Sequence, residues 1–326
     1  MIRVSDAPAP LPARTDGDVA DILAGLEREP RSLPSRLFYD EAGCALFGRI
    51  TELPEYYVTR SEMALLAAHA EEIAASVRSG SVLVEYGASD ESKGAVLLRA
   101  AAGRLSAYVP IDIAGPALDA LRERMRQSHP GLEVRPVEAD FTAPVALPEI
   151  AADRPRLGFF PGSTIGNFEP DMVVRFLRQA RADLSRDAGR DPARFVIGTD
   201  LRKQRSVLVP AYDDAAGVTA AFNRNILRHV NRLVGADFDP ELFAHRAVWN
   251  EREGRIEMHL VSRLPQVVRV AGHAISFAAG EGIHTESSYK HTRDGFLDLA
   301  GQAGWAPDGF WTDPEGRFGM HRLIAR

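Results

Sequence analysis

Two acidic residues close neighbouring predicted strands of the chain, and their type suits recognition of a nucleoside. Asp112 ends the apolar run 105–112, and Asp140, followed by Phe141, ends the run 133–140. A carboxylate at such a strand end can accept hydrogen bonds from both hydroxyls of a ribose. An acid beside an aromatic ring suits the amine and the flat face of adenine. Each acid alone could merely cap the next segment, but together they indicate a nucleoside pocket.

A glycine turn, EYGASDESKG at 85–94, closes the preceding strand. Gly87 allows a ligand to approach backbone N–H groups closely, although an ordinary strand–helix turn can have the same residues. Ala88 departs from the GxGxxG pattern, and Asp90 and Glu91 would repel a pyrophosphate, so a dinucleotide is disfavoured. A nucleoside pocket without a phosphate clamp indicates S-adenosylmethionine.

The segment FFPGSTIGNFEP, residues 159–170, brings small and polar residues to the end of a further strand. Asn167 has two hydrogen-bond donors and one acceptor on its side chain, so it can hold both an amine and a carboxylate. We expect this turn to face the sulfur of the methyl donor. The alternative is that Asn167 and Glu169 only cap the helix that begins near Pro170.

The elements that must position these residues alternate regularly from residue 82 onward. Apolar runs separated by helical segments predict strands at 82–86, 105–112, 133–140, 157–162 and 194–200. Strands and helices at this spacing predict an α/β fold with a doubly wound, Rossmann-like and mainly parallel sheet.

The alternation stops after Asp200. A helical stretch at 213–235 and several strands predicted to be antiparallel indicate a second, smaller α+β domain. We therefore expect three parts: a flexible arm at 1–12, a substrate-binding domain formed by 13–60 and 201–289, and a core formed by 61–200 and 290–326.

The composition limits partners and location. The 326 residues are 45% hydrophobic and have a net charge of −6, an acidic balance that argues against nucleic-acid binding. No apolar run reaches the roughly 18 residues needed to cross a bilayer, and the first residues lack the apolar stretch of a signal peptide. We expect a cytoplasmic monomer.

A single cysteine, Cys44, and histidines without paired-ligand spacing predict no disulfide and no metal. The basic segment LRKQR, at 201–205, predicts a solvated face or a loop near the donor.

Four longer segments resemble the L-histidine Nα-methyltransferase family of ergothioneine biosynthesis. They are LFYDEAGCALFGRITELPEYYVTRSE, FFPGSTIGNF, VPAYDDAAGVTAAFNRNILRHVNRLVGADFDPELF and IHTESSYK. The resemblance runs over nearly the whole chain and implies a class I methyltransferase core with a family-specific second domain. It also implies three successive methyl transfers from S-adenosylmethionine to the α-amine of L-histidine, which give hercynine.

The same resemblance implies the residues of the site. The donor would be bound by Tyr39, Gly87, Lys93, Asp112, Asp140 and Phe141. The amino acid would be bound by Tyr56, Asn167, Tyr212, Glu286 and Ser288, the first three being catalytic. The chain departs from the usual family pattern at Ala88 and Gly94, where Gly and Thr are more common.

Methyl transfer requires a neutral amine in line with the sulfonium, so the protein contributes mainly positioning and desolvation. Tyr56, Asn167 and Tyr212 offer uncharged hydrogen bonds, which orient an amine without holding it as ammonium. Glu286 and Ser288, two residues apart on an extended segment, face the same side and could meet the two imidazole nitrogens. The alternative for Glu286 is a surface carboxylate paired with Lys290.

Other functions remain open at this point. The nearest is a methyltransferase for another aromatic amino acid, such as tryptophan, or one that stops short of trimethylation. A non-catalytic S-adenosylmethionine-binding protein would not need the amino-acid residues named above. A nicotinamide oxidoreductase is disfavoured because GxGxxG is missing.

Overall fold

The computed structural model describes residues 16–88, 90–101, 103–186 and 192–326, which divide into two compact units. Unit 1 comprises the described residues up to Tyr56, together with Arg205–Asn250 and Ile256–Ser287. Unit 2 comprises Tyr57–Gln204, Glu251–Arg255 and Ser288–Arg326. The arm predicted at 1–12 lies outside the described residues.

Unit 2 is built on an eight-stranded sheet with the order β13-β14-β7-β6-β2-β3-β4, in which β5 also pairs with β3. Its strands are β2 (Ser81–Tyr86), β3 (Leu105–Asp112), β4 (Glu133–Val134), β5 (Val137–Glu138), β6 (Arg156–Phe160), β7 (Arg194–Asp200), β13 (Trp305–Thr312) and β14 (Phe318–Ala325). The pairs β2–β3, β2–β6, β6–β7, β3–β4 and β3–β5 are parallel, whereas β14 is antiparallel to both β7 and β13. The strand order reverses at β2, as a doubly wound fold requires.

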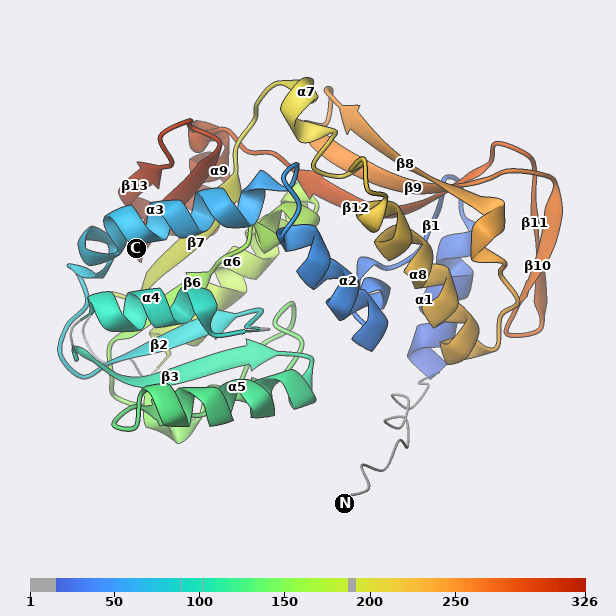
Figure 1. Ribbon diagram of the computed structural model, residues 1–326. Coiled ribbons are helices and arrows are strands. Elements are labelled where there is room, and N and C mark those ends of the chain that lie inside the picture. Colours follow the sequence, from blue (N-terminus) through green and yellow to red (C-terminus); the bar gives the residue numbers. More distant parts are fainter. Residues whose placement is uncertain (1–15, 89, 102, 187–191) are drawn as a thin grey trace, which may run out of the picture. The chain divides into compact units, whose positions relative to one another are not determined.

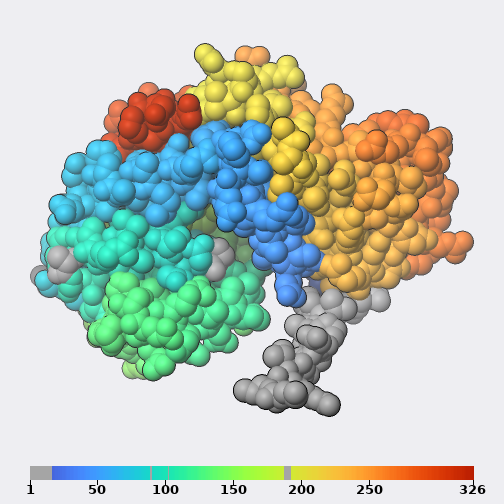
Figure 2. Space-filling view, viewed as in Figure 1, coloured from blue at the N-terminus to red at the C-terminus, as the bar shows by residue number. Residues whose placement is uncertain are grey.

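Helices cover both faces of this sheet (Figure 1). One face carries α3 (Tyr57–Ala74), α4 (Ser92–Ala100) and α5 (Gly115–Ser128), which form the surface of unit 2 seen in the space-filling view (Figure 2). The other face carries α6 (Pro170–Ser185) and α9 (Arg293–Gln302), with the short 3-10 helices η2 (Glu149–Ala151) and η3 (Thr164–Asn167) in the connections. Because both faces are covered, strands such as β2 and β6 are buried at every residue.

One sequence expectation for unit 2 needs correction. The run predicted as one strand at 133–140 forms two short strands, β4 and β5, separated by Arg135-Pro136. Proline has no N–H to donate to the ladder, which explains the break.

Unit 1 combines helices with two smaller sheets. A four-stranded sheet has the order β1-β12-β9-β8, and β10 and β11 form an antiparallel hairpin. The strands are β1 (Arg31–Ser32), β8 (Phe243–Asn250), β9 (Arg255–Ser262), β10 (Gln266–Val270), β11 (His273–Phe277) and β12 (Gly282–Tyr289). The helices are α1 (Asp16–Glu27), η1 (Ser35–Phe38), α2 (Glu41–Thr51), α7 (Arg205–Leu208), α8 (Val218–Val234) and η4 (Pro240–Leu242). The boundary between the units falls within β12, after Ser287. Among the described residues, no helix has the length and apolar character to cross a membrane.

Candidate active site

The turn after β2 is held against the end of β3. The N–H groups of Gly87 and Ala88 both donate to the carbonyl of Ile111, at 2.8 and 3.1 Å. Gly87 has a φ of 71°, a conformation that favours glycine. The turn therefore has a fixed backbone beside the carboxyl ends of β2 and β3, where a doubly wound sheet binds its ligands.

Asp112 and Asp140 lie on adjacent backbone segments of this edge. The N–H of Ala139 donates to the carbonyl of Asp112 at 2.9 Å. Each carboxylate accepts a bond from a residue two positions further along: Asp112 Oδ1 from the N–H of Ala114, and Asp140 Oδ1 from the N–H of Thr142, both at 2.9 Å. These local bonds hold both side chains in place, so the capping alternative and a ligand-binding role are compatible. Burial raises the pKa of Asp112.

Phe141 packs edge-on against the aromatic residues of the core rather than stacking on them. Its ring centroid lies 5.5 Å from that of Phe160 and 6.4 Å from that of Tyr86, with interplanar angles of 69° and 86°. A Cβ at Gly87 would lie 3.6 Å from the Phe141 ring. The ring therefore stands beside the glycine turn, next to Asp140.

Lys93, predicted to bind the donor, forms an ion pair with Glu62. Its Nζ lies 2.7 Å from Glu62 Oε2, and the fully buried Glu62 also accepts the N–H of Gly162 at 2.8 Å. Burial acts to lower the pKa of Lys93, but the Glu62 carboxylate outweighs it and the pKa is raised. The pair links α3, α4 and the turn after β6. Sequence reasoning missed Glu62, because an acid in the middle of a helix reads as an exposed position.

A buried carboxylic acid stands at the end of β2. Tyr108 OH donates to Glu85 Oε2 at 2.7 Å, and burial raises the pKa of Glu85 to about 8. A Cβ at residue 94 would lie 2.3 Å from the same oxygen, so Gly94 leaves room for this carboxyl group. Gly94, where the family more commonly has threonine, therefore lies against the carboxyl group of Glu85, which is protonated at neutral pH.

The turn that bears Asn167 packs closely on the end of β12. Ser163 adopts a φ of 55°, and its Oγ accepts the N–H of Asp200 at 2.8 Å. A Cβ at Gly166 would lie 2.8 Å from the carbonyl oxygen of Tyr289, so only glycine fits there. Asn167 is the last residue of η3.

Glu169 occupies the N-cap position of α6, but its side chain makes no capping hydrogen bond. It forms an ion pair with Arg255 Nη1 at 2.7 Å and accepts a hydrogen bond from Tyr289 OH. The capping alternative is therefore wrong for the side chain of Glu169.

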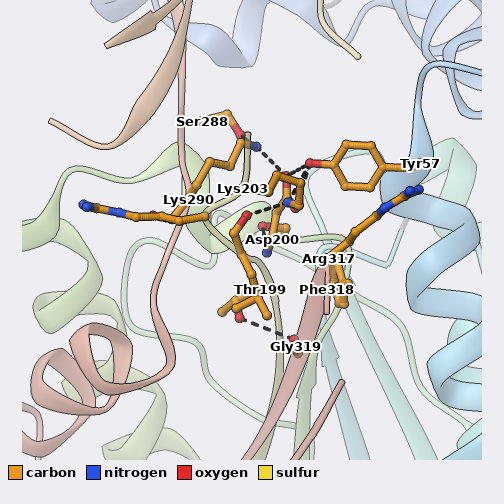
Figure 3. Close-up of polar contacts among 12 residues, drawn as sticks. Tyr57, Thr199, Asp200, Lys203, Ser288, Lys290, Arg317, Phe318 and Gly319 are labelled. Atoms are coloured by element: carbon orange, nitrogen blue, oxygen red, sulfur yellow. Dashed lines mark hydrogen bonds and ion pairs between the residues drawn. The ribbon is translucent and has the colours of Figure 1, made fainter. Parts of the chain in front are cut away.

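A buried charged group, the Asp200 cluster, lies at the carboxyl end of β7 and consists of Asp200, Tyr57, Lys203, Lys290 and Ser288 (Figure 3). Asp200 accepts from Tyr57 OH at 2.8 Å, from Lys203 Nζ at 2.5 Å and from Lys290 Nζ at 2.8 Å. The side chains of Asp200 and Lys290 are fully buried. Burial acts to raise the pKa of Asp200, but the two lysines outweigh it and the pKa is lowered. Burial lowers the pKa of Lys203 to about 8.

The structure corrects the solvated face predicted for Lys203 and shows that Ser288 belongs to the Asp200 cluster. Only 9% of the Lys203 side chain is exposed, so a solvated face is wrong for this residue of LRKQR. Ser288 Oγ accepts from Lys290 Nζ at 2.8 Å. Glu286 and Ser288 lie on the same side of β12 and are 8% and 4% exposed, so Glu286 is not a surface carboxylate.

In unit 1, the tyrosines predicted to bind donor and amino acid lie together. The ring centroids of Tyr56 and Tyr212 are 6.3 Å apart, and Phe47 lies 6.2 Å from Tyr56 and 6.1 Å from Tyr39. Burial raises the pKa of Tyr39 well above its usual value, and the charges of Glu286, Tyr56 and Tyr212 raise it further. Tyr39 is 42% exposed as a whole residue, and the effect of Glu286 on its pKa places that carboxylate within electrostatic reach of the phenol. Phe47 was missed because a single apolar residue on a helix gives no signal beyond packing.

Among the described residues, no group of three or more His, Cys, Asp or Glu side chains could hold a metal ion. The residues brought together are instead carboxylates at strand ends in unit 2 and phenols with one carboxylate in unit 1. No observation here tests the binding roles predicted for them, which stay predictions.

The doubly wound sheet, with its antiparallel strand β14 between β7 and β13, has the topology of a class I methyltransferase core. Residues 18–325 match the family described as "Histidine-specific methyltransferase, SAM-dependent". The chain belongs to this family.

Two curated relatives are similar over almost their whole length. The histidine N-alpha-methyltransferase of Mycolicibacterium smegmatis is 41% identical over 309 residues, which cover 93% of this chain and 94% of the relative. The enzyme of the same name from Mycobacterium tuberculosis is 40% identical over 304 residues, which cover 92% of each chain. Among solved structures, an S-adenosylmethionine-dependent methyltransferase from Clostridium acetobutylicum matches with a TM-score of 0.48 and 8% identity, covering 86% of this chain and 98% of that one.

Proposed function

We propose that the chain transfers three methyl groups from S-adenosylmethionine to the α-amine of L-histidine, giving hercynine, as the first step of ergothioneine biosynthesis. Membership of the histidine-specific family over residues 18–325 supports the donor and the substrate. The observation that carries the amino-acid site is that Tyr39, Tyr56 and Tyr212 lie together around Phe47 in unit 1, with the Glu286 carboxylate near enough to raise the pKa of Tyr39.

The donor is bound by the carboxyl edge of the unit 2 sheet. Asp112 accepts from the ribose hydroxyls, and Asp140 with Phe141 receives the adenine. Gly87 lets the donor approach the backbone, and Lys93, held by Glu62, lies beside the turn at Gly162. Tyr39 completes this set. Bound S-adenosylmethionine supplies the electrophilic methyl group.

The imidazole is bound by two residues of opposite hydrogen-bonding character. Lys290 can only donate, so Ser288 Oγ accepts in that bond and its own hydroxyl proton is a donor. Glu286 is an acceptor. A neutral imidazole carries one N–H and one nitrogen lone pair, so one acceptor and one donor match it. Indole has an N–H but no such lone pair, which favours histidine over tryptophan.

The amine is oriented by uncharged groups. Tyr56, Asn167 and Tyr212 hydrogen-bond to it without fixing it as ammonium, so a lone pair is available for in-line attack on the methyl group. Each transfer adds bulk and finally a permanent positive charge. The aromatic faces of Tyr56, Tyr212 and Phe47 tolerate that charge by cation–π attraction.

Incubation of the chain with L-histidine and isotopically labelled S-adenosylmethionine, followed by mass spectrometry, tests the proposal. We expect products with one, two and three added methyl groups, ending at hercynine. A panel with tryptophan, phenylalanine and tyrosine runs in parallel. Turnover of tryptophan but not histidine would overturn the substrate, and accumulation of a dimethyl product would overturn trimethylation.

The Asn167→Ala variant tests whether Asn167 binds the amino acid rather than the methyl donor. It should bind S-adenosylmethionine as the unchanged chain does but bind histidine more weakly, because it lacks the amide. Normal histidine binding combined with loss of the donor would reassign Asn167.

We further propose that the chain acts as a cytoplasmic monomer on small molecules, without a metal, a nucleic-acid partner or a membrane. The net charge of −6 supports the absence of nucleic acid. Sedimentation analysis checks the monomer, and turnover after treatment with a chelator should be unchanged.

A further inference from the structure

A hydrogen-bonded network of uncharged side chains connects three elements of unit 1 to the main chain of Tyr212. We call it the Asn223 network: Asn223 on α8, His245 on β8 and Thr285 on β12. His245 Nε2 lies 2.8 Å from the carbonyl oxygen of Tyr212, and His245 Nδ1 lies 2.9 Å from Asn223 Nδ2. Thr285 Oγ1 lies 2.7 Å from Asn223 Oδ1. Asn223 is fully buried and Thr285 is 1% exposed.

The orientation of the Asn223 amide follows from its neighbours. Its Nδ2 lies 3.1 Å from the backbone carbonyl of His259, which can only accept, so the nitrogen and not the oxygen must face that group. One of the two amide hydrogens goes to His259, and the other goes to His245 Nδ1. The amide oxygen then accepts from Thr285 Oγ1 at 2.7 Å, which is shorter than the 3.0 Å from the same hydroxyl to the carbonyl oxygen of Met258.

This orientation fixes the state of His245. Because Asn223 donates to Nδ1, that nitrogen must hold a lone pair, and the ring proton must be on Nε2, where it is donated to Tyr212. Burial lowers the pKa of His245, and Arg224 lowers it further, while the Tyr212 carbonyl, Asp213 and Asp214 raise it. The Asp213 carboxylate lies 3.9 Å from Nε2. The imidazole is therefore neutral and held as one tautomer.

We propose that His245 and Asn223 are positioning residues of the amino-acid site, because they fix the backbone of Tyr212 to the strand that carries Glu286. This inference rests on the proposed function, which assigns Tyr212 and Glu286 to the amino acid. Thr285 directly precedes Glu286, so the network joins the two assigned residues through hydrogen bonds. A carbonyl and an amide held in this way cannot drift without leaving a buried polar group unpaired.

Two substitutions of His245 separate positioning from packing. The side-chain nitrogen of glutamine reaches the place of Nε2, so His245→Gln keeps the donor to the Tyr212 carbonyl and loses the acceptor for Asn223. Asparagine is shorter and places its oxygen near Nδ1, so His245→Asn keeps the acceptor and loses the bond to Tyr212. Steady-state turnover of histidine, with separate kcat and KM, is the measurement, and calorimetric affinity for S-adenosylmethionine is the control.

We expect kcat/KM for histidine to fall at least tenfold in His245→Asn and less than threefold in His245→Gln, with donor affinity within twofold of the unchanged chain in both. Equal losses in the two variants would overturn the positioning role.

The unchanged chain distinguishes this inference from the proposed function: if the unchanged chain leaves histidine unmethylated, the proposed function fails. If it methylates histidine and the variants do not differ, only the present inference fails.

A second measurement needs no stable variant. In the unchanged chain labelled with ¹⁵N-histidine, the His245 ring should give the nitrogen signals of a neutral imidazole protonated on Nε2, and it should take up its second proton at a lower pH than an exposed histidine does. A signal from the Nδ1-protonated form, or from imidazolium at neutral pH, would contradict the network and the inference with it.

Discussion

The two units hold their buried polar groups in different ways. In unit 2, the Asp200 cluster pairs one carboxylate with two lysines, and Glu62 pairs with Lys93. In unit 1, the Asn223 network contains an amide, a hydroxyl and a neutral imidazole. Buried ions are strongly interdependent, because removal of one partner leaves an uncompensated charge. Neutral groups lose only a hydrogen bond and its desolvation. Each unit should therefore respond differently to the loss of one side chain.

The neutral groups of unit 1 also suit the proposed reaction. The tyrosines and the Asn223 network present no fixed positive charge to an amine that becomes a cation. The charged clusters belong to unit 2, which also contributes Asn167 and Ser288 to the proposed amino-acid site.

The largest effect is expected from Asp200→Ala. It leaves Lys290, whose side chain is fully buried, and the mostly buried Lys203 without their carboxylate. We expect the free energy of unfolding to fall by about 3–5 kcal/mol, as for other broken buried ion pairs. Urea denaturation followed by circular dichroism measures this.

The matched variant in the neutral network is Asn223→Ala. It leaves a carbonyl and a ring nitrogen unpaired, so the loss should be about 1–3 kcal/mol. Losses of the same size in both variants would remove the contrast between the units.

The second prediction concerns acid. His321 on β14 is fully buried between the rings of Phe296 and Phe310, and neither ring nitrogen has a hydrogen-bond partner among the described residues. Burial lowers its pKa to about 3, so the imidazole is neutral in the folded protein. Since the unfolded chain takes up a proton near pH 6.5, stability falls as the pH falls from 6.5 towards 3.

His321→Leu should remove this sensitivity. The measured quantity is the free energy of unfolding of the variant minus that of the unchanged chain. This difference should be about 3 kcal/mol more favourable to the variant at pH 4.5 than at pH 7.5, because two pH units separate pH 4.5 from the pKa of histidine in the unfolded chain. Denaturation curves at the two pH values give this double difference. A difference that does not change with pH would mean that His321 is protonated or exposed in the folded state.

The third prediction tests whether the carboxyl edge of the unit 2 sheet contributes to donor binding. Asp112→Ala removes a carboxylate from the end of β3, so affinity for S-adenosylmethionine should fall by about 1–3 kcal/mol, the range for hydrogen bonds to a charged group. Histidine affinity should be unchanged. Calorimetric titration of each ligand is the measurement, and unchanged donor affinity would remove Asp112 from the ribose role.

The smallest effect is expected from Glu286→Gln in unit 1. The amide keeps the shape but loses the charge, so histidine affinity should fall by about 1–2 kcal/mol while donor affinity stays the same. Competition between histidine and tryptophan, read by mass spectrometry, should show a narrower preference. If the preference is unchanged, the imidazole is recognised by other residues.

Much of unit 2 could be predicted from its sequence because its pattern is local. The runs at 105–112 and 194–200 have the bounds of β3 and β7, and the predicted doubly wound class is confirmed. The run at 133–140 alternates as a single strand would, but Pro136 has no N–H to donate to the ladder, so two short strands form. Residues at strand ends can be found in the same way, since the end of a strand is visible in the sequence.

The residues that hold the site in place could not be predicted. The local sequence offers Lys290 only its near neighbour Glu286 as a partner, whereas Lys290 is buried against Asp200, ninety residues earlier in the chain. His245 and Asn223 come from separate elements and show no periodic pattern. Long-range pairs of this kind depend on which segments meet in space, and a single sequence contains no local signal for that.

The chain passes between the two units five times, at 56/57, 204/205, 250/251, 255/256 and 287/288, and the last passage lies inside one continuous strand. A gene fusion or recombination event with one or two junctions therefore cannot exchange unit 1 for another module. New amino-acid preferences in this architecture should arise by point substitution within a shared frame, and engineering of the specificity should proceed by the same route rather than by domain grafting.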